Sequence, residues 1–159
     1  MSDFNVGVIN RLRKNQRNIE RLETQIETGR WIDWTPTVTQ SGSVTVTVNY
    51  ATYVVDSSGK VTINCRLTVT GSGTAANLIS IGGIPSNAQP KRFGGLTTIG
   101  IATIQDSGTK TYGGLSVIAT SASEFRFIGF DQANFVGVSP NFALASGDTI
   151  TFLITYEIS

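Results

Sequence analysis

Hydrophobic residues in the first thirty positions recur alternately four and three residues apart and form one narrow seam. The positions beside the seam are polar, as at Arg11 and Gln16. A helix that packs against its own domain needs a wider apolar stripe, whereas a narrow seam is typical of coiled coils. The pattern predicts a helix over about residues 5–29, capped by Gly29, with a coiled-coil stalk over residues 11–30. The seam, which we predict to be the oligomerisation site, consists of Val8, Leu12, Asn15, Ile19, Leu22 and Ile26.

The number of chains in this coiled coil is not fixed by the seam alone. Isoleucine at position a with leucine at position d favours two strands by the local rule. The polar Asn15 at a d position and the strongly apolar middle strands described below favour three. We therefore expect a parallel homotrimer, with a dimer as the alternative.

After residue 36 the apolar period changes from that of a helix to two. Valines alternate with threonines over residues 44–50, and the same alternation returns over residues 61–69 and 150–158. Strict alternation predicts strands with one buried face and one solvent-exposed face. Between the first two strands, Asp56-Ser-Ser-Gly59 predicts a tight hairpin turn. The fold class is thus mainly β, an antiparallel β-sandwich head over residues 31–159.

The middle strands carry apolar residues on both faces, over residues 96–104, 115–120 and 125–130. A strand that is apolar on both faces is buried on both. In a two-layer domain the second face needs either a covering loop or a neighbouring subunit, and we favour the neighbour. The stretches 71–95 and 131–147 hold the remaining prolines and are predicted to be long loops.

Composition excludes several classes of protein. The 159 residues carry a net charge of only +1 and 14% charged residues, without the basic excess that nucleic-acid binding requires. The longest apolar runs are too short to span a bilayer, so we expect no membrane insertion. The first ten residues lack the features of a secretion signal, and the single Cys65 excludes an intramolecular disulfide framework.

Candidate chemistry is sparse. The chain has no histidine, which removes the commonest general base and zinc ligand. Cys65 is in register with core positions of its strand and is predicted to be buried and inert. The acidic residues at the turns lie far apart in sequence and show no calcium-loop spacing. We therefore expect no catalytic residue, no metal site and no cofactor, and a protein that is not an enzyme.

Residues 1–10 are predicted to form a separate attachment segment. They contain more apolar residues than a free terminus needs, and Gly7 lowers the helix propensity just before the regular seam begins. Short apolar segments of this kind can become ordered in a socket on a larger assembly. The alternative is an early start of the coiled coil. The residues that would dock are Phe4, Val6, Val8 and Ile9.

Aromatic residues in the predicted loops offer a candidate ligand site. Rings beside charged and amide side chains can stack on sugars, although the rings can equally cover the edge of a sandwich. Loops also carry recognition on rigid scaffolds. The candidate ligand-binding residues are Lys91, Arg92, Phe93, Phe135 and Asn141.

Two segments that frame the β region, Trp31–Val38 and Ala145–Ile158, carry a resemblance. Together they resemble the compact β-sandwich modules that end many bacteriophage fibre and appendage proteins. Those modules are similar to the trimeric jelly roll of the complement globular head and tumour-necrosis-factor families. The similarity covers residues 31–159 in length and strand rhythm, and it implies a jelly-roll-like head.

The resemblance implies a function as well as a fold. It implies a structural virion fibre, assembled in the host cytoplasm, with its N-terminus on other virion proteins and its head meeting the host. A host-surface glycan is the expected receptor. The location on tail or head stays open, and so do two alternatives: a head fibre or capsid decoration protein without receptor binding, and a free jelly-roll lectin.

Overall fold

The computed structural model describes residues 11–19, 29–91, 97–129 and 134–158. Within these residues the chain is mainly β, with one short helical stretch over residues 11–19 and a single 3-10 turn. The strands are β1 (Ile32–Asp33), β2 (Thr37–Thr39), β3 (Ser43–Val44), β4 (Val46–Val55), β5 (Lys60–Val69), β6 (Ser80–Gly82), β7 (Thr98–Asp106), β8 (Lys110–Ser121), β9 (Glu124–Ile128) and β10 (Thr149–Glu157), and the 3-10 turn is η1 (Ser86–Ala88).

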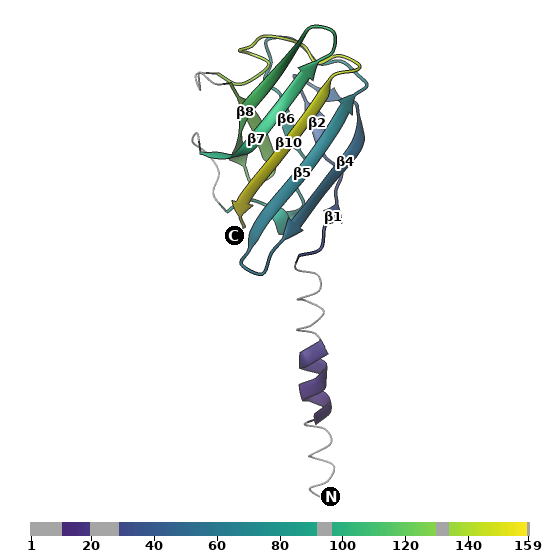
Figure 1. The fold of residues 1–159 in the computed structure, drawn as a ribbon, viewed down its shortest axis with the longest axis vertical. Coiled ribbons are helices and arrows are strands. Elements are labelled where there is room, and N and C mark those ends of the chain that lie inside the picture. The colour runs from purple at the N-terminus through teal and green to yellow at the C-terminus, as the bar shows by residue number, and fades with distance from the viewer. Residues whose placement is uncertain (1–10, 20–28, 92–96, 130–133, 159) are drawn as a thin grey trace, which may run out of the picture.

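All ten strands belong to one antiparallel sheet in the order β1-β4-β5-β10-β7-β8-β9-β6-β2-β3. The sheet curls, so that β6 and β2 lie behind β7 and β10 in Figure 1. Thr45 alone links β3, at one end of this order, to β4, near the other end. The Thr45 carbonyl accepts the N–H groups of Thr70 and Gly71, which fixes this corner. The mainly β prediction is confirmed, and the topology is compatible with a jelly roll.

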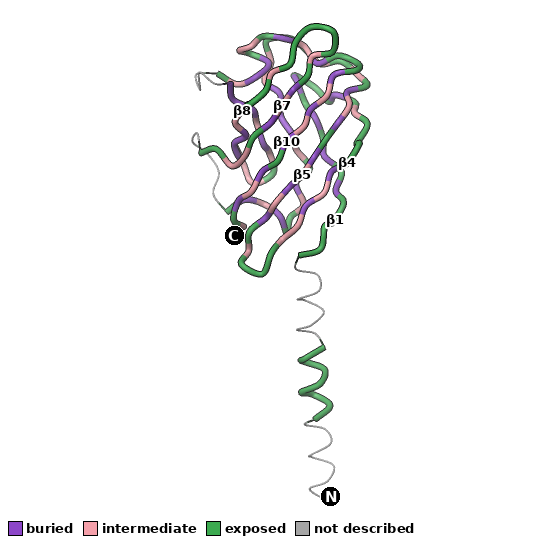
Figure 2. The backbone as a smooth tube through the Cα atoms, viewed as in Figure 1, coloured by how far each residue is buried: buried purple, intermediate pink, exposed green. Residues whose placement is uncertain are grey.

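The core lies between the two halves of the curled sheet, and Figure 2 shows buried and exposed residues alternating along the strands. The inward residues of β5 are fully buried, and so are those at the centre of β10, as the alternation predicted. The predicted turn is confirmed: Gly59 has φ +79°, and Asp56 Oδ1 accepts the N–H groups of Ser58 and Lys60. The inward faces of β5 and β10 and the turn at Gly59 were therefore predictable from the sequence.

The alternation predicted for residues 44–50 is correct only in part. Val44 is buried, but Val48 and Tyr50 are 38% and 41% exposed. A register shift between Val48 and Tyr50 places an extra residue in β4, so Tyr50 pairs with the outward-facing Arg66. A bulge of this kind moves every following side chain to the other face. The inward positions of β4 are therefore Ala51 and Tyr53.

Two further details differ from the sequence prediction. The short strand β6 and the turn η1 lie inside the stretch that was predicted to be a loop. On the outer side of β8 and β9, Ile118 and Ile128 are 1% and 3% exposed within this single chain. The chain itself therefore covers these two residues, which is the alternative that we did not favour for the middle strands.

Candidate functional site

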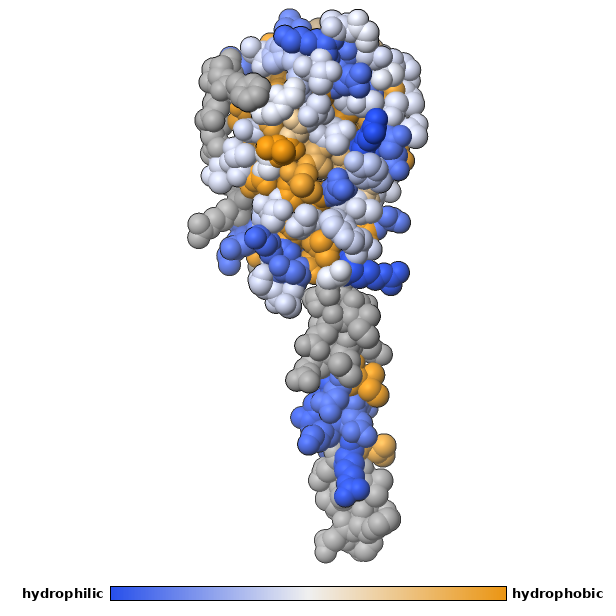
Figure 3. All heavy atoms as spheres, in the orientation of Figure 1, coloured by the Kyte–Doolittle hydropathy of each residue, from blue (hydrophilic) through white to orange (hydrophobic). Residues whose placement is uncertain are grey.

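Residues 11–19 are helical and every one of them is exposed. Leu12 and Ile19 are 62% and 55% exposed and lie seven residues apart, with Asn15 between them. On the face seen in Figure 3, the apolar atoms of this helical stretch lie along one side and the other visible atoms are hydrophilic. The other predicted seam residues, Val8, Leu22 and Ile26, lie outside the described residues. A single helix is shown here, and the coiled coil remains a prediction.

The predicted attachment residues, Phe4, Val6, Val8 and Ile9, all lie outside the described residues, as do Arg92 and Phe93 of the predicted ligand site. Lys91 is exposed, and its backbone N–H donates to the Glu157 carbonyl at the end of β10 (2.9 Å). It stands beside Pro90, which pairs with Ile158.

Phe135 and Asn141 have structural contacts of their own. The ring of Phe135 lies beneath the guanidinium of Arg126, 5.5 Å from centroid to Cζ, and Phe135 pairs with Ile128. The Oδ1 of Asn141 accepts the N–H of Ala76 at 2.7 Å. Both side chains therefore hold loops of the head in place.

The structure does not bring Lys91 and Asn141 together. Lys91 lies beside the last residue of β10, whereas Asn141 belongs to the segment that leads into its first residue, Thr149. The nine residues of β10 span about 30 Å. In Figure 1 the loops around Asn141 lie at the end of the head opposite the C-terminus. The predicted site is thus divided between the two ends of the head.

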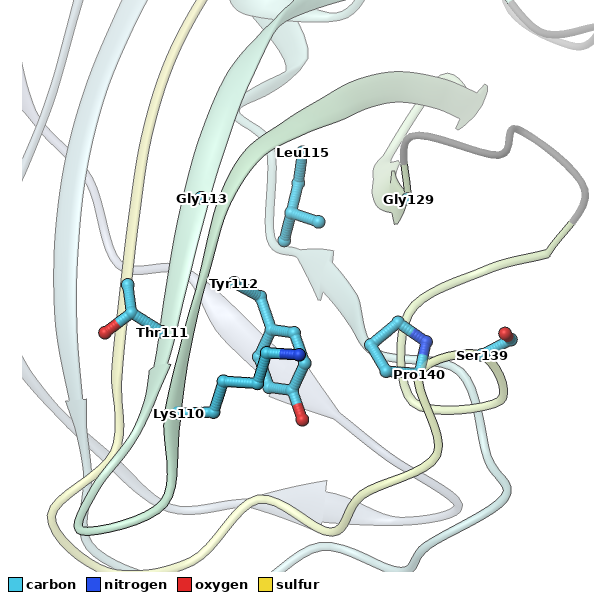
Figure 4. A pocket seen from close by; sticks show the side chains of 8 residues that line it. All are labelled: Lys110, Thr111, Tyr112, Gly113, Leu115, Gly129, Ser139 and Pro140. Carbon is cyan, nitrogen blue, oxygen red and sulfur yellow. The ribbon is translucent and has the colours of Figure 1, made fainter.

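A cleft lies near the start of β8, at the same end of the head as Asn141. Its volume is about 420 Å³, and it is lined by residues 110–113 and Leu115 of β8, by Gly129 after β9, and by Ser139 and Pro140. Figure 4 shows Lys110 and Tyr112 on one side of this space and Ser139 and Pro140 on the other, with Leu115 above. We call this space the β8 cleft.

The Tyr112 ring forms the aromatic wall of the β8 cleft, and it is fixed in place by neighbouring side chains. The rings of Tyr112 and Phe142 stack at 4.8 Å between centroids with an interplanar angle of 12°. Lys110 Nζ lies 5.4 Å from the Tyr112 centroid, at cation–π distance. Phe142 is buried, and its carbonyl accepts the side-chain N–H of the buried Gln40 at 2.8 Å. The wall is therefore pre-positioned by the core.

A second exposed feature lies on the outer face of the sheet. Ile101 of β7 and Leu153 of β10 are direct cross-strand partners and are 64% and 49% exposed. Asn64 of β5 pairs with Leu153, and Ser116 of β8 pairs with Ile101, so this row across four strands is uncharged. Figure 3 shows an apolar area on the face where β5, β10 and β7 lie in Figure 1.

The described residues hold one buried thiol and no cluster of metal-binding side chains. Cys65 is fully buried, and burial raises the pKa of its thiol to about 12, which keeps it protonated and inert. The described residues contain no group of three or more Cys, Asp or Glu that could hold a metal ion. The helical residues that the structure describes include no stretch long and apolar enough to cross a membrane.

Neither Lys110 nor Tyr112 was among the predicted site residues. A signal was present: a cation and a ring two residues apart on one strand share a face. The exposed pair Ile101 and Leu153 also has a signal, because each is an apolar residue at an outward position of its strand.

Comparisons with known proteins give no relative. No family model matches the chain, and no curated protein and no solved structure matches it either.

Proposed function

We propose that this chain is a structural, non-enzymatic fibre or appendage protein of a bacteriophage virion. It works as a parallel homotrimer, with residues 1–10 docked on another virion protein and the β head displayed for adhesion to a host-surface glycan. The observation that carries the proposal is the exposed seam on the helix ahead of the head. Leu12 and Ile19 are both more than half exposed and seven residues apart.

The spacing of these two residues supports self-association. Residues seven apart return to the same side of a helix, and a repeat of this length is satisfied by a second copy of the same helix. An isolated short helix of this kind is marginal in water, so it needs partners to be stable. Parallel partners bring their heads together at one end.

The outer face of the head provides a second surface for self-association. Cores of protein interfaces are depleted in charged residues and enriched in apolar ones. The row Asn64, Leu153, Ile101 and Ser116 has this composition. Packed against a neighbouring head, it would bury two large side chains that a single head leaves in water.

The framing segments support the virion role by resemblance alone. Trp31–Val38 contains β1 and the first two residues of β2, and Ala145–Ile158 contains β10, so both framing segments contribute to the sheet. The modules that they resemble end phage fibres and appendages. A capsid decoration protein shares this architecture and differs in having no receptor.

Association with particles tests the proposal. Particles assembled with the full chain, or with residues 1–10 replaced by a glycine-serine segment of equal length, are purified and probed with an antibody to the head. We expect the full chain on the particles and the replaced chain in the soluble fraction. A full chain that never co-purifies with particles contradicts the virion role, and equal retention of both chains contradicts the docking segment.

A further inference from the structure

We infer that the β8 cleft binds one carboxylated sugar unit of a surface glycan, with the ammonium of Lys110 pairing the carboxylate. This inference rests on the proposed adhesive role of the head. It identifies the ligand class and moves the binding site from the loop of Lys91 to the start of β8.

The charge at the cleft comes from Lys110. Its Nζ lies over the ring of Tyr112, and no carboxylate of the described residues is within 4.0 Å of it. Asp106 stands opposite Lys110 in the hairpin, yet the two side chains form no ion pair there. By contrast, Arg126 is paired with Glu124. Among the described residues, Lys110 therefore has no ion-pair partner at the rim of the cleft, where an anionic ligand can pair with it.

The other residues that line the cleft offer both apolar and hydrogen-bonding contacts to a sugar ring. Leu115 and Pro140 supply apolar surface for its C–H groups, and the Tyr112 hydroxyl supplies a hydrogen-bonding group for its hydroxyls. Figure 4 shows Tyr112 and Pro140 facing each other across the space. A cleft of about 420 Å³ holds a ligand of one or two rings.

Rigidity adds to the case for a binding site. The Tyr112 ring is stacked on Phe142, and Phe142 is tied to Gln40 through its carbonyl, so the wall needs no ordering when a ligand binds. The start of β8, which lines the cleft, also lies at the end of the head opposite the C-terminus. A site at this end is suited to display.

Saturation-transfer NMR on the full chain tests the inference, with sodium glucuronate as the acidic probe and glucose as its neutral counterpart. We expect glucuronate to bind the native chain and glucose to bind at least about tenfold more weakly, as the loss of a charge-assisted hydrogen bond implies. Lys110→Met keeps the aliphatic stem and should weaken glucuronate binding about tenfold. Lys91→Met, which removes an exposed cation at the other end of the head, should leave it unchanged.

Three outcomes overturn the inference. They are no transfer to glucuronate at tens of millimolar, equal binding of glucose and glucuronate, and equal losses in Lys110→Met and Lys91→Met. Light scattering on the same samples measures self-association, and the particle assay above measures docking. Both are independent of ligand binding. A trimer that docks on particles but fails these tests would refute the cleft and leave the proposed fibre intact.

Discussion

Gln40 is a buried amide that joins three loop segments at one end of the head. It is 1% exposed; its Nε2 donates to the Asn77 and Phe142 carbonyls, and its Oε1 accepts the Leu144 N–H at 2.8 Å. A buried polar side chain with all its groups satisfied specifies one arrangement of the chain around it. Nothing near Gln40 in the sequence indicates this role, because its partners are up to 104 positions away.

Replacing Gln40 should destabilise the head. Gln40→Leu leaves two carbonyls and one N–H without their partner, and each unsatisfied buried group costs about 1–3 kcal/mol. We expect the free energy of unfolding to fall by at least about 2 kcal/mol in urea titrations. Gln105→Leu, at an exposed position of β7, is the matched control and should stay within about 0.5 kcal/mol of the native chain. Equal effects of the two changes would contradict the role of Gln40.

Cys65 makes the stability of the head sensitive to alkaline pH. Burial raises the pKa of its thiol from 9.0 to about 12, and burial also raises the pKa of Tyr156. Above pH 9 the unfolded chain therefore loses the thiol proton while the folded chain keeps it. The stabilisation that comes from the protonated thiol is fully present below pH 9 and is lost as the pH rises toward 12. At pH 10.5 the free energy of unfolding should be lower by about 2 kcal/mol from Cys65 alone.

Unfolding titrations at pH 7, 9 and 10.5 measure this slope. In Cys65→Ala the slope above pH 9 should shrink to the part that Tyr156 contributes, whatever the cost of the substitution at pH 7. An unchanged slope, or rapid reaction of the native thiol with an aromatic disulfide at pH 8, would show that Cys65 is not enclosed.

At the scale of the elements, β7 approaches β10 closely at Gly100. A Cβ built on Gly100 would lie 2.2 Å from the Leu153 carbonyl oxygen and 2.6 Å from the Ile154 Cα. These neighbours are backbone atoms of the adjacent strand and cannot rotate away. The glycine is therefore required by the spacing of the two strands.

Gly100→Ala should separate β7 from β10 and destabilise the head by about 1–3 kcal/mol or more. Gly113→Ala, in β8, is the matched control, because a Cβ there meets nothing within 4 Å. We expect the melting temperature to fall for Gly100→Ala and to change little for Gly113→Ala. A harmless Gly100→Ala would mean that the strands pair differently from the structure.

The sequence predicted the elements whose apolar period is regular and long. The strands β5 and β10 alternate over nine or more residues, so their inward faces were correct and their boundaries were correct to within one residue. The bulge in β4 was not predictable, because an extra residue changes the faces without changing the alternation of residue types. The strand β6 has three residues and too few positions to show a period. Its place in the sheet is set by its partners β2 and β9.

The candidate site was predicted less well than the fold. Lys91 and Asn141 both have side chains that can bind a ligand. The distance between them, however, depends on which end of β10 each segment contacts. The β8 cleft arises from contacts between β8 and the loop of Ser139 and Pro140, which are 29 positions or more from Lys110 in sequence. Residue types suggest a ligand, whereas only tertiary contacts show where its walls meet.

For the whole molecule, we propose that self-association uses two surfaces, the helical seam and the outer face of the head. Leu12→Asp would put a buried charge from each chain into one layer of the coiled coil, which costs several kcal/mol without partners. We expect this change to weaken the stalk while the heads remain associated. Gln16→Asp, beside the seam, is the matched control and should have little effect on assembly.

Leu153→Lys tests the contribution of the heads. It introduces a charge at an exposed position, so a monomeric head should tolerate it, whereas a packed interface should not. Combined with Leu12→Asp it should give monomers. Complete dissociation by Leu12→Asp alone would place the assembly energy in the stalk, and full assembly of the double variant would contradict both surfaces.

Self-association of the full chain can be read from its mass in solution. Light scattering coupled to size-exclusion chromatography, at a chain concentration of tens of micromolar, should give about 51 kDa, three times the 17.0 kDa of one chain. A mass near that of one chain would contradict the account. A mass of two chains would show that the local preference of the seam decides the assembly, and would contradict the trimer.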